Sequence, residues 1–160
     1  MCHLTHMNEK IDNIDRIILH ELQKESDLSQ RALAEKVGLS QNACWRRLKH
    51  LEERGILKGS RARIDAPALG LDLTVFVMVK TRNHSLAWSN KFRQHVEAIA
   101  EVQELHRIGG DWDYMLKLCC KGMAGYDAVY RRLIDGFELE AVTGHFSMEP
   151  IFEDRPLHVF

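Results

Sequence analysis

Residues 29–56 read SQRALAEKVGLSQNACWRRLKHLEERGI, and they contain two short helical patterns that meet at Gly38-Leu39-Ser40. Ser29 and Ser40 are good N-cap residues, because a serine hydroxyl can accept a hydrogen bond from a free backbone N–H of the first turn. Gly38 is a typical residue at the end of a helix. Two helices joined by a short turn that contains glycine are typical of a helix-turn-helix. We therefore expect a helix-turn-helix over about residues 29–54.

The second helical pattern has two different faces. Its apolar side repeats at helical spacing and is expected to be buried. The other side carries amide, aromatic and cationic groups, which can contact base edges and phosphates. Those four residues are Asn42, Trp45, Arg46 and Lys49.

A solvated polar face is the alternative interpretation of such a helix. Three neighbouring features favour DNA binding instead. They are the glycine turn, a preceding helical pattern over residues 11–22 with isoleucine and leucine on one face, and a basic segment that follows. We interpret the second helix as a DNA recognition helix.

The basic segment, residues 56–64, suggests a hairpin with a tight turn at Gly59-Ser60. Arg61 and Arg63 would project from the same side of its second strand, because strand side chains alternate. A wing that holds the DNA backbone and a linker strand with solvated arginines are about equally good interpretations. The candidate DNA-binding residues are Ser29, Gln30, Ser40, Gln41, Asn42, Trp45, Arg46, Arg47, Lys49, Arg61 and Arg63.

Positive charge is concentrated in this part of the chain. Residues 40–63 hold seven Lys and Arg residues and two acidic residues, although the whole chain has a net charge of −1. Residues 1–64 carry a net charge of +3, and residues 65–160 carry −4. One chain therefore makes few phosphate contacts, so tight DNA binding is expected to require a dimer or larger assembly with several recognition helices.

Composition excludes several other classes of protein. A chain of 160 residues with 45% hydrophobic and 28% charged residues is ordinary for a soluble globular protein of one medium or two small domains. No apolar run approaches the roughly 18 residues of a membrane span. Residues 1–7 lack the plan of a signal peptide and are expected to be a disordered leader. A cytoplasmic protein is expected.

Cysteine and histidine spacing does not indicate a metal site. The four cysteines include no CxxC pair, and the nine histidines show no ligand spacing on a helix. Cys44, Cys119 and Cys120 are expected to be buried free thiols. We expect neither a metal nor a cofactor.

The second half of the chain changes to a strand-rich pattern. A linker is expected at residues 65–71, where proline and glycine interrupt both periodicities. Strand patterns cover residues 71–81, 102–108, 112–120 and 142–149, with helical patterns around residues 88–99 and 126–133. The order βαββαβ is the ferredoxin-like plan, an antiparallel four-stranded sheet with both helices on one side. The predicted chain is thus α+β, with a winged helix-turn-helix domain at residues 8–64 and a ferredoxin-like domain at residues 72–152.

The first strand of the second half is apolar on both faces. Val75, Val77 and Val79 lie on one side, and Phe76 and Met78 on the other. Because both helices are expected on one side of the sheet, the second side would meet water. We expect a homodimer that buries this side against a second copy. Cover by the N-terminal domain is the competing explanation.

From about residue 9 onward the chain resembles the Lrp/AsnC (leucine-responsive/asparagine regulator) family of transcription factors. In the first half the resemblance depends on Asp15, Ile18-Leu19, Leu22-Gln23, Leu33-Ala34, Val37-Gly38-Leu39-Ser40, Cys44, Arg47-Leu48, Leu51-Glu52 and Gly55-Ile56. In the second half, Gly110-Asp111-Trp112-Asp113-Tyr114 resembles the family's Gly-Asp-aromatic-Asp-Tyr signature.

The resemblance implies a winged helix-turn-helix, a linker, and a ferredoxin-like effector domain that binds amino acids and assembles dimers into octamers. The chain departs from the pattern at Gln41-Asn42-Ala43, where many relatives carry proline and serine or threonine before the cysteine. The operator sequence of those relatives therefore does not transfer to this chain.

The signature hairpin suits a ligand that carries both an ammonium and a carboxylate. Its glycines allow backbone N–H groups to approach a carboxylate, an aspartate can receive the ammonium, and the aromatic residues can supply an apolar wall. A simple turn, with Asp and Gly chosen for geometry, is the alternative. The resemblance favours effector binding, and the candidate residues are Gly109, Gly110, Asp111, Trp112, Asp113 and Tyr114.

The expected function is a DNA-binding transcriptional regulator whose DNA binding or assembly responds to an amino acid, with control of amino-acid metabolism genes. Its expected partners are double-stranded DNA, further copies of itself and the amino acid, and no membrane. An architectural DNA-binding protein without a ligand is one alternative. An enzyme is another, in which Asp111 and Asp113 would hold a metal or act as acid and base, but no phosphate-binding loop, paired nucleophile or third metal ligand completes such a site. We therefore expect no catalytic residue.

Overall fold

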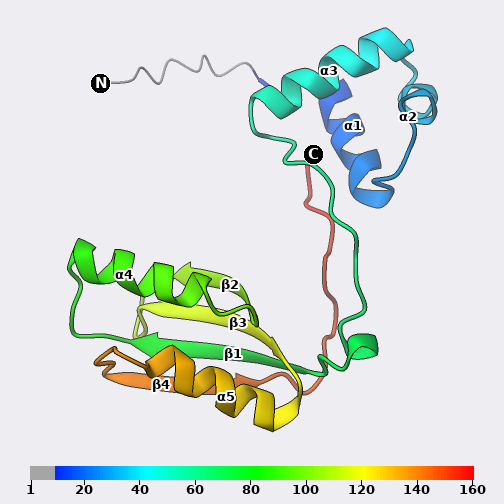
Figure 1. The fold of residues 1–160 in the computed structure, drawn as a ribbon. Helices are drawn as coiled ribbons and strands as arrows, with labels where there is room; N and C mark the ends of the chain where they lie inside the picture. The colour runs from blue at the N-terminus through cyan, green and yellow to red at the C-terminus, as the bar shows by residue number, and fades with distance from the viewer. Residues whose placement is uncertain (1–9) are drawn as a thin grey trace. The chain divides into compact units, whose positions relative to one another are not determined.

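The computed structural model describes residues 10–160, which form two compact units (Figure 1). The first unit combines the chain up to Ala62 with the C-terminal segment Phe152–Phe160, and the second unit is Arg63–Ile151. The expected leader at residues 1–7 and the expected first residue of the DNA-binding domain lie outside the described residues.

The first unit contains three helices, α1 (Asn13–Lys24), α2 (Gln30–Lys36) and α3 (Gln41–Glu53). Their apolar faces meet in a core of residues that are at most 1% exposed, which are Ile18, Leu33, Ala34, Cys44 and Leu51. The helices and the spacing of their apolar residues agree with the sequence-based expectation.

Each helix of the first unit begins at a side-chain cap. Asp12 and Asp15 form a reciprocal capping box at the start of α1. The hydroxyls of Ser29 and Ser40 accept hydrogen bonds from the third backbone N–H of α2 and α3, at 3.1 and 3.3 Å. Between α2 and α3, Gly38 adopts a φ of +68°, which residues with a Cβ rarely take. The turn that sets α3 against α2 therefore depends on glycine.

The C-terminal segment, residues 152–160, packs against α1. The Gln23 amide makes two hydrogen bonds with the backbone of Leu157, accepting from its N–H at 2.6 Å and donating to its carbonyl at 3.2 Å. The Arg16 guanidinium donates to the Val159 carbonyl, and the His20 ring lies edge-on to Phe160 with centroids 5.6 Å apart. The first unit is therefore discontinuous in sequence, which the sequence analysis did not predict.

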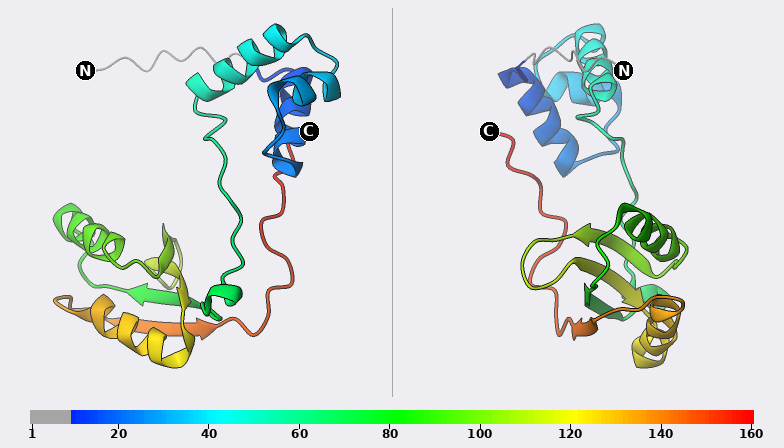
Figure 2. Two further views of the ribbon diagram at one scale, coloured as in Figure 1. Left: turned by 45° about the vertical axis from the view of Figure 1, so that its right-hand side comes forward. Right: turned by 90° about the vertical axis from the view of Figure 1, so that its left-hand side faces the viewer.

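The second unit is a four-stranded sheet with two helices. Its elements are β1 (Leu73–Lys80), α4 (Leu86–Glu97), β2 (Val102–Arg107), β3 (Tyr114–Cys120), α5 (Gly122–Ile134) and β4 (Ala141–Phe146). The strand order is β2-β3-β1-β4, and every neighbouring pair is antiparallel. Both helices cover the same face of the sheet, as Figures 1 and 2 show. The ferredoxin-like prediction is confirmed.

The core of the second unit lies between the sheet and its helices. Val75, Val77 and Val79 of β1 are fully buried there, against Phe92 and Val96 of α4. On the opposite face of the sheet, Phe76 and Met78 remain partly exposed. The strand thus has the two apolar faces expected from its sequence, and the helices of its own unit cover one of them.

Two expectations of local structure are wrong. Residues 56–64 form no strand pair, and the short 3-10 helix Pro67–Leu69 is the only regular element between α3 and β1. A two-stranded ribbon is marginal on its own, and residues 58–64 are all exposed, so no packing stabilises one. In addition, Cys119 is only partly buried, whereas Cys44 and Cys120 are buried as expected.

Two kinds of feature are absent from the residues that the structure describes. None of the helices in residues 10–160 is long and apolar enough to cross a membrane. No cluster of three His, Cys, Asp or Glu side chains in the same part of the chain has the arrangement of a metal site.

Candidate DNA-binding helix and effector pocket

The exposed face of α3 carries the four side chains predicted to contact DNA. Asn42, Trp45, Arg46 and Lys49 are all exposed, and Trp45 is unusual for its size because 45% of its surface remains accessible. Packing in the first unit accounts for the other side of the helix, where Cys44 and Leu51 are fully buried. The helix therefore presents amide, indole and cationic groups together along one stripe.

Arg47, one of the predicted DNA-binding residues, forms ion pairs within the first unit. Its guanidinium forms ion pairs with Asp12 at 2.7 Å and Asp15 at 2.8 Å, which fix α3 to the start of α1. Hydrogen bonds with Asp15 and then Asp12 raise the pKa of Arg47. At Asp12, the Asp15 backbone N–H and then Arg47 hold the pKa of the carboxyl below its usual range. Arg47 is thus a structural side chain and not part of the exposed stripe.

The two cations of the stripe differ in their surroundings. Within the described part of the chain Arg46 forms no ion pair, whereas Lys49 is paired with Glu52 at 2.7 Å. The Glu52 hydrogen bond raises the pKa of Lys49. Because both partners are about half exposed, this pair is weak. Lys49 can exchange Glu52 for a phosphate at small cost.

The remaining predicted DNA-binding residues fall into two groups. Ser29, Gln30, Ser40 and Gln41 lie exposed at the N-termini of α2 and α3, where the two serines are also the caps. Arg61 and Arg63 lie exposed in the irregular segment after α3 and not on a wing strand. The structure thus brings the first group to helix ends and leaves the second group outside any regular element.

Asp113 connects the β2–β3 hairpin to the loop that follows β1. Its carboxylate accepts a hydrogen bond from the backbone N–H of Thr81 at 2.8 Å, and its own N–H donates to the Val79 carbonyl at 3.0 Å. The His84 ring lies 3.6 Å from the other carboxylate oxygen. Asp113 therefore holds the loop of residues 81–85 against the hairpin.

A small pocket of about 110 Å³ opens beside this aspartate, and we call it the hairpin pocket. It is lined by His84, Leu86, Ser89, Arg107, Asp113 and Tyr114. Tyr114 is buried, and its hydroxyl lies 3.1 Å from the Ser89 hydroxyl. The pocket holds one guanidinium and one carboxylate, which is the charge pattern that a zwitterionic amino acid requires.

Two of the six predicted effector residues, Asp113 and Tyr114, line the hairpin pocket. Gly109, Gly110, Asp111 and Trp112 belong to the same hairpin but do not line it. Gly110 adopts a φ of +119°, so this glycine is required by the turn. His84, Ser89 and Arg107 were not predicted from the sequence, since contacts between separate elements place them here. Arg107 of β2 pairs with Tyr114 of β3, Ser89 of α4 reaches the Tyr114 hydroxyl, and His84 lies beside Asp113.

Comparisons with known proteins cover nearly the whole chain. A family model described as winged helix-turn-helix DNA-binding matches residues 11–58, and one described as the Lrp/AsnC ligand binding domain matches residues 74–157. The glutamate uptake regulatory protein of Zymomonas mobilis is 40% identical over 145 residues, 91% of this chain and 88% of that protein. The transcriptional activator DecR of Escherichia coli is 42% identical over 142 residues, 88% of this chain and 93% of that protein.

Solved structures of similar proteins agree. An AsnC family regulator from Agrobacterium tumefaciens superimposes with a TM-score of 0.87 at 39% identity, over 92% of this chain and 97% of that one. A regulator from Neisseria meningitidis, solved with L-Met, also gives 0.87, at 27% identity over 94% and 97%. These relatives are transcriptional regulators, not enzymes. The chain belongs to the Lrp/AsnC family of DNA-binding transcriptional regulators, with a helix-turn-helix domain and an amino-acid ligand-binding domain.

Proposed function

We propose that this protein binds operator DNA through the exposed stripe of α3, and that an amino acid in the hairpin pocket changes its DNA affinity or its assembly. Control of amino-acid metabolism genes follows as part of this proposal. The observation that carries it is the separation of roles on α3. Arg47 and the apolar residues fix the helix, while Asn42, Trp45, Arg46 and Lys49 stay exposed to a partner.

The chemistry of the hairpin pocket supports the effector part of the proposal. Arg107 can pair with the α-carboxylate of an amino acid, and Asp113 can accept a hydrogen bond from its ammonium. Four of its lining residues, Leu86, Ser89, Arg107 and Tyr114, also line a wider hollow of about 570 Å³. A relative from Neisseria meningitidis was solved as a complex with L-Met, which makes an amino acid the first class of ligand to test.

Self-association completes the proposal. The face of the sheet that lacks helices carries Phe76, Met78 and Met115, all partly exposed at neighbouring positions. A second copy of the chain would remove this apolar surface from water. We propose a homodimer formed through this face and, following the family resemblance, four such dimers in an octamer.

DNA titration tests the role of α3. Arg46→Ala is expected to weaken binding by on the order of 1–3 kcal/mol and to relax sequence preference if the guanidinium contacts a base. Lys49→Ala is expected to weaken binding evenly over sequences and to lower the salt slope by about one unit. Gln94→Ala, at an exposed position of α4, is the control. Unchanged affinity in both α3 variants would remove this helix from the interface.

Titration of the same DNA in the presence of each of the twenty amino acids tests the effector site. At least one amino acid is expected to change DNA affinity or particle size, because a ligand that binds two states unequally shifts their populations. The response should be lost in Arg107→Gln and retained in Asp111→Ala, since Asp111 is exposed and lies outside the pocket. If no amino acid changes DNA affinity, particle size or the melting temperature, the protein is an architectural DNA-binding protein.

A further inference from the structure

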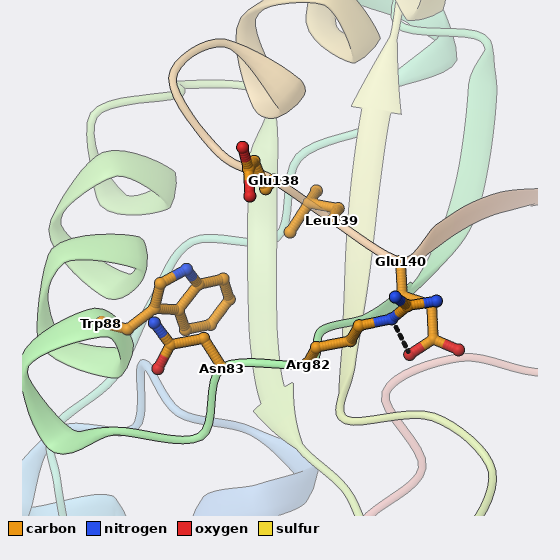
Figure 3. Close-up of a pocket in the computed structure, with 6 residues that line it drawn as sticks. All are labelled: Arg82, Asn83, Trp88, Glu138, Leu139 and Glu140. Carbon is orange, nitrogen blue, oxygen red and sulfur yellow. Dashed lines mark ion pairs between the residues drawn. The ribbon is translucent and has the colours of Figure 1, made fainter.

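A second, larger cavity lies at the same end of the sheet as the hairpin pocket. Its position follows from the strand register, because the end of β1 at Lys80 pairs with the start of β4 at Ala141. The cavity has a volume of about 480 Å³ and lies between the loop after β1 and the loop before β4 (Figure 3). It is lined by Arg82, Asn83, Trp88, Glu138, Leu139 and Glu140. We call it the Trp88 cavity.

Its apolar wall is held in place by the core. The Trp88 ring stacks on Phe92 with centroids 5.0 Å apart and an interplanar angle of 14°. The Phe137 ring meets Trp88 edge-on at 5.7 Å. Across the cavity, Leu139 adds a second apolar side chain, as Figure 3 shows. An apolar group placed between Trp88 and Leu139 would meet a rigid surface, which costs little conformational entropy on binding.

The charged rim of the cavity is only partly neutralised. Glu140 has two cations nearby, the Arg82 Nε at 3.6 Å and the Lys80 Nζ at 3.9 Å. Glu138 is exposed and has no ion-pair partner among residues 10–160. The Arg82 side chain is 85% exposed and meets Glu140 through Nε, which leaves its two terminal nitrogens free to donate. One carboxylate and one end of a guanidinium are therefore available to a ligand.

The loop after β1 contributes residues to both pockets. His84 lines the hairpin pocket, whereas Arg82 and Asn83 line the Trp88 cavity. The loop is fixed by its own side chains, because Thr81 Oγ1 accepts from the Asn83 N–H at 3.1 Å and Asn83 Oδ1 accepts from the Ser85 N–H at 3.0 Å. The Asn83 amide nitrogen keeps its two donors, and Figure 3 places this side chain beside the Trp88 ring.

We propose that the Trp88 cavity is a second amino-acid site, separate from the hairpin pocket. Glu138 receives the ammonium of the ligand, and Arg82 receives its carboxylate. The ligand's side chain lies between Trp88 and Leu139. The larger volume suits an amino acid with a long or aromatic side chain. This inference goes beyond the proposed function and does not depend on it, since binding at this cavity is measured without DNA.

Fluorescence of Trp88 tests the proposal on the full chain. In a Trp45→Phe, Trp112→Phe background, Trp88 is the only tryptophan, and each of the twenty L-amino acids is titrated against its emission. We expect a saturable change with at least one of them, and we expect the N-acetyl derivative of that amino acid, which lacks the ammonium, to give none.

Matched variants separate this cavity from the hairpin pocket. Glu138→Gln and Arg82→Gln are each expected to weaken binding by about tenfold or more, because each removes a charge-assisted hydrogen bond. Asp135→Asn, an exposed position in the same loop as Glu138 but outside the cavity, should bind like the background protein. Arg107→Gln should do the same, since Arg107 does not line the Trp88 cavity.

Two results would overturn the second site. One is the absence of any saturable change in Trp88 emission with all twenty amino acids. The other is binding that is lost in Arg107→Gln and retained in Glu138→Gln, which would place the only ligand in the hairpin pocket. In that second case the proposed effector function stands while this inference fails, so the two failures are distinguishable.

Discussion

Gly144 in β4 makes room for an aromatic ring of α5. It pairs with Val77 on the helix-facing side of the sheet, and a Cβ built at this position would lie 2.4 Å from the Tyr126 hydroxyl oxygen and 2.9 Å from its ring. Tyr126 also meets Phe146 edge-on at 5.2 Å. Burial raises the pKa of the Tyr126 hydroxyl, which keeps it neutral. The glycine is thus required by packing and not by a turn.

Gly144→Ala is therefore expected to lower the free energy of unfolding by on the order of 1–3 kcal/mol, since an added methyl group forces Tyr126 to move. Gly125→Ala is the matched control, because its Cβ would be 3.6 Å from the nearest atom, an ordinary contact. Urea denaturation measures the free energy of unfolding of both variants. Adding Tyr126→Phe to Gly144→Ala should restore part of the loss. Equal midpoints for Gly144→Ala and the parent would contradict this explanation.

Asp12 gives the first unit a defined dependence on pH. The Asp15 backbone N–H and then Arg47 lower the pKa of Asp12 in the folded state from its ordinary value of 3.8. The stabilisation is therefore complete above that ordinary value and is lost as the pH falls through the lowered one. We expect Asp12→Asn to lower stability at neutral pH and to flatten the acid side of the stability curve. Parallel curves for the two proteins from pH 6 to pH 2 would argue against this role.

At the scale of elements, α3 separates two adjacent arginines by function. Arg47 faces α1 and its two aspartates, whereas Arg46 faces outward. The order of the two residues in the sequence gives no hint of this difference. It arises because successive residues of a helix point about 100° apart, so neighbours fall on different faces.

Exchanging each arginine for alanine should separate the two roles. Arg47→Ala is expected to lower the melting temperature of the first unit, because it leaves the mostly buried Asp15 without its cation. Arg46→Ala should leave the melting temperature unchanged and weaken DNA binding. Calorimetry measures the melting temperature of both variants, and DNA titration measures their affinity for DNA. Equal melting temperatures would show that the ion pairs of Arg47 contribute nothing measurable.

The helices and strands could largely be predicted from the sequence, because their signals are local. Serine caps mark α2 and α3, and a nearly continuous apolar run marks β1. The absence of a wing hairpin could not be predicted, since Gly59 and the alternating arginines suggest a turn and a strand, and the sequence does not show that nothing packs on them. The candidate site could be predicted only in part, because some of its residues come together through contacts between elements that are distant in sequence. Asp113 carries a sequence signature, whereas the pairing of β2 with β3 brings Arg107 to the hairpin pocket and the pairing of β1 with β3 brings the loop that carries His84.

At the scale of the whole molecule, the helix-free face of the sheet carries apolar side chains that its own unit leaves partly exposed. Phe76 pairs with Lys117 and Met78 with Met115, so apolar and polar side chains share this face. Within one chain no helix of the second unit covers it. A face with both kinds of side chain can be buried in an assembly, and it can also contact water when the chain is alone.

Met78→Glu is expected to reduce the mass of the particle in solution, because a charge in the centre of an apolar interface loses its hydration without gaining a partner. Light scattering after size exclusion measures the mass. Gln94→Glu, which adds the same charge at an exposed site on α4, should leave it unchanged. A parent protein that is already monomeric would refute the sheet interface, as would an unchanged mass for Met78→Glu.

The return of residues 152–160 to α1 makes the effector unit an insertion within the DNA-binding unit. Cutting the chain at its linker would therefore not release a complete DNA-binding unit, because part of that unit would stay attached to the other fragment. A purification tag fused after Phe160 would likewise sit on the DNA-binding unit, beside His20, and not on the effector unit. A minimal DNA-binding fragment has to join residues 10–62 to residues 152–160 through a new connection, and its design begins with the Gln23–Leu157 amide pair.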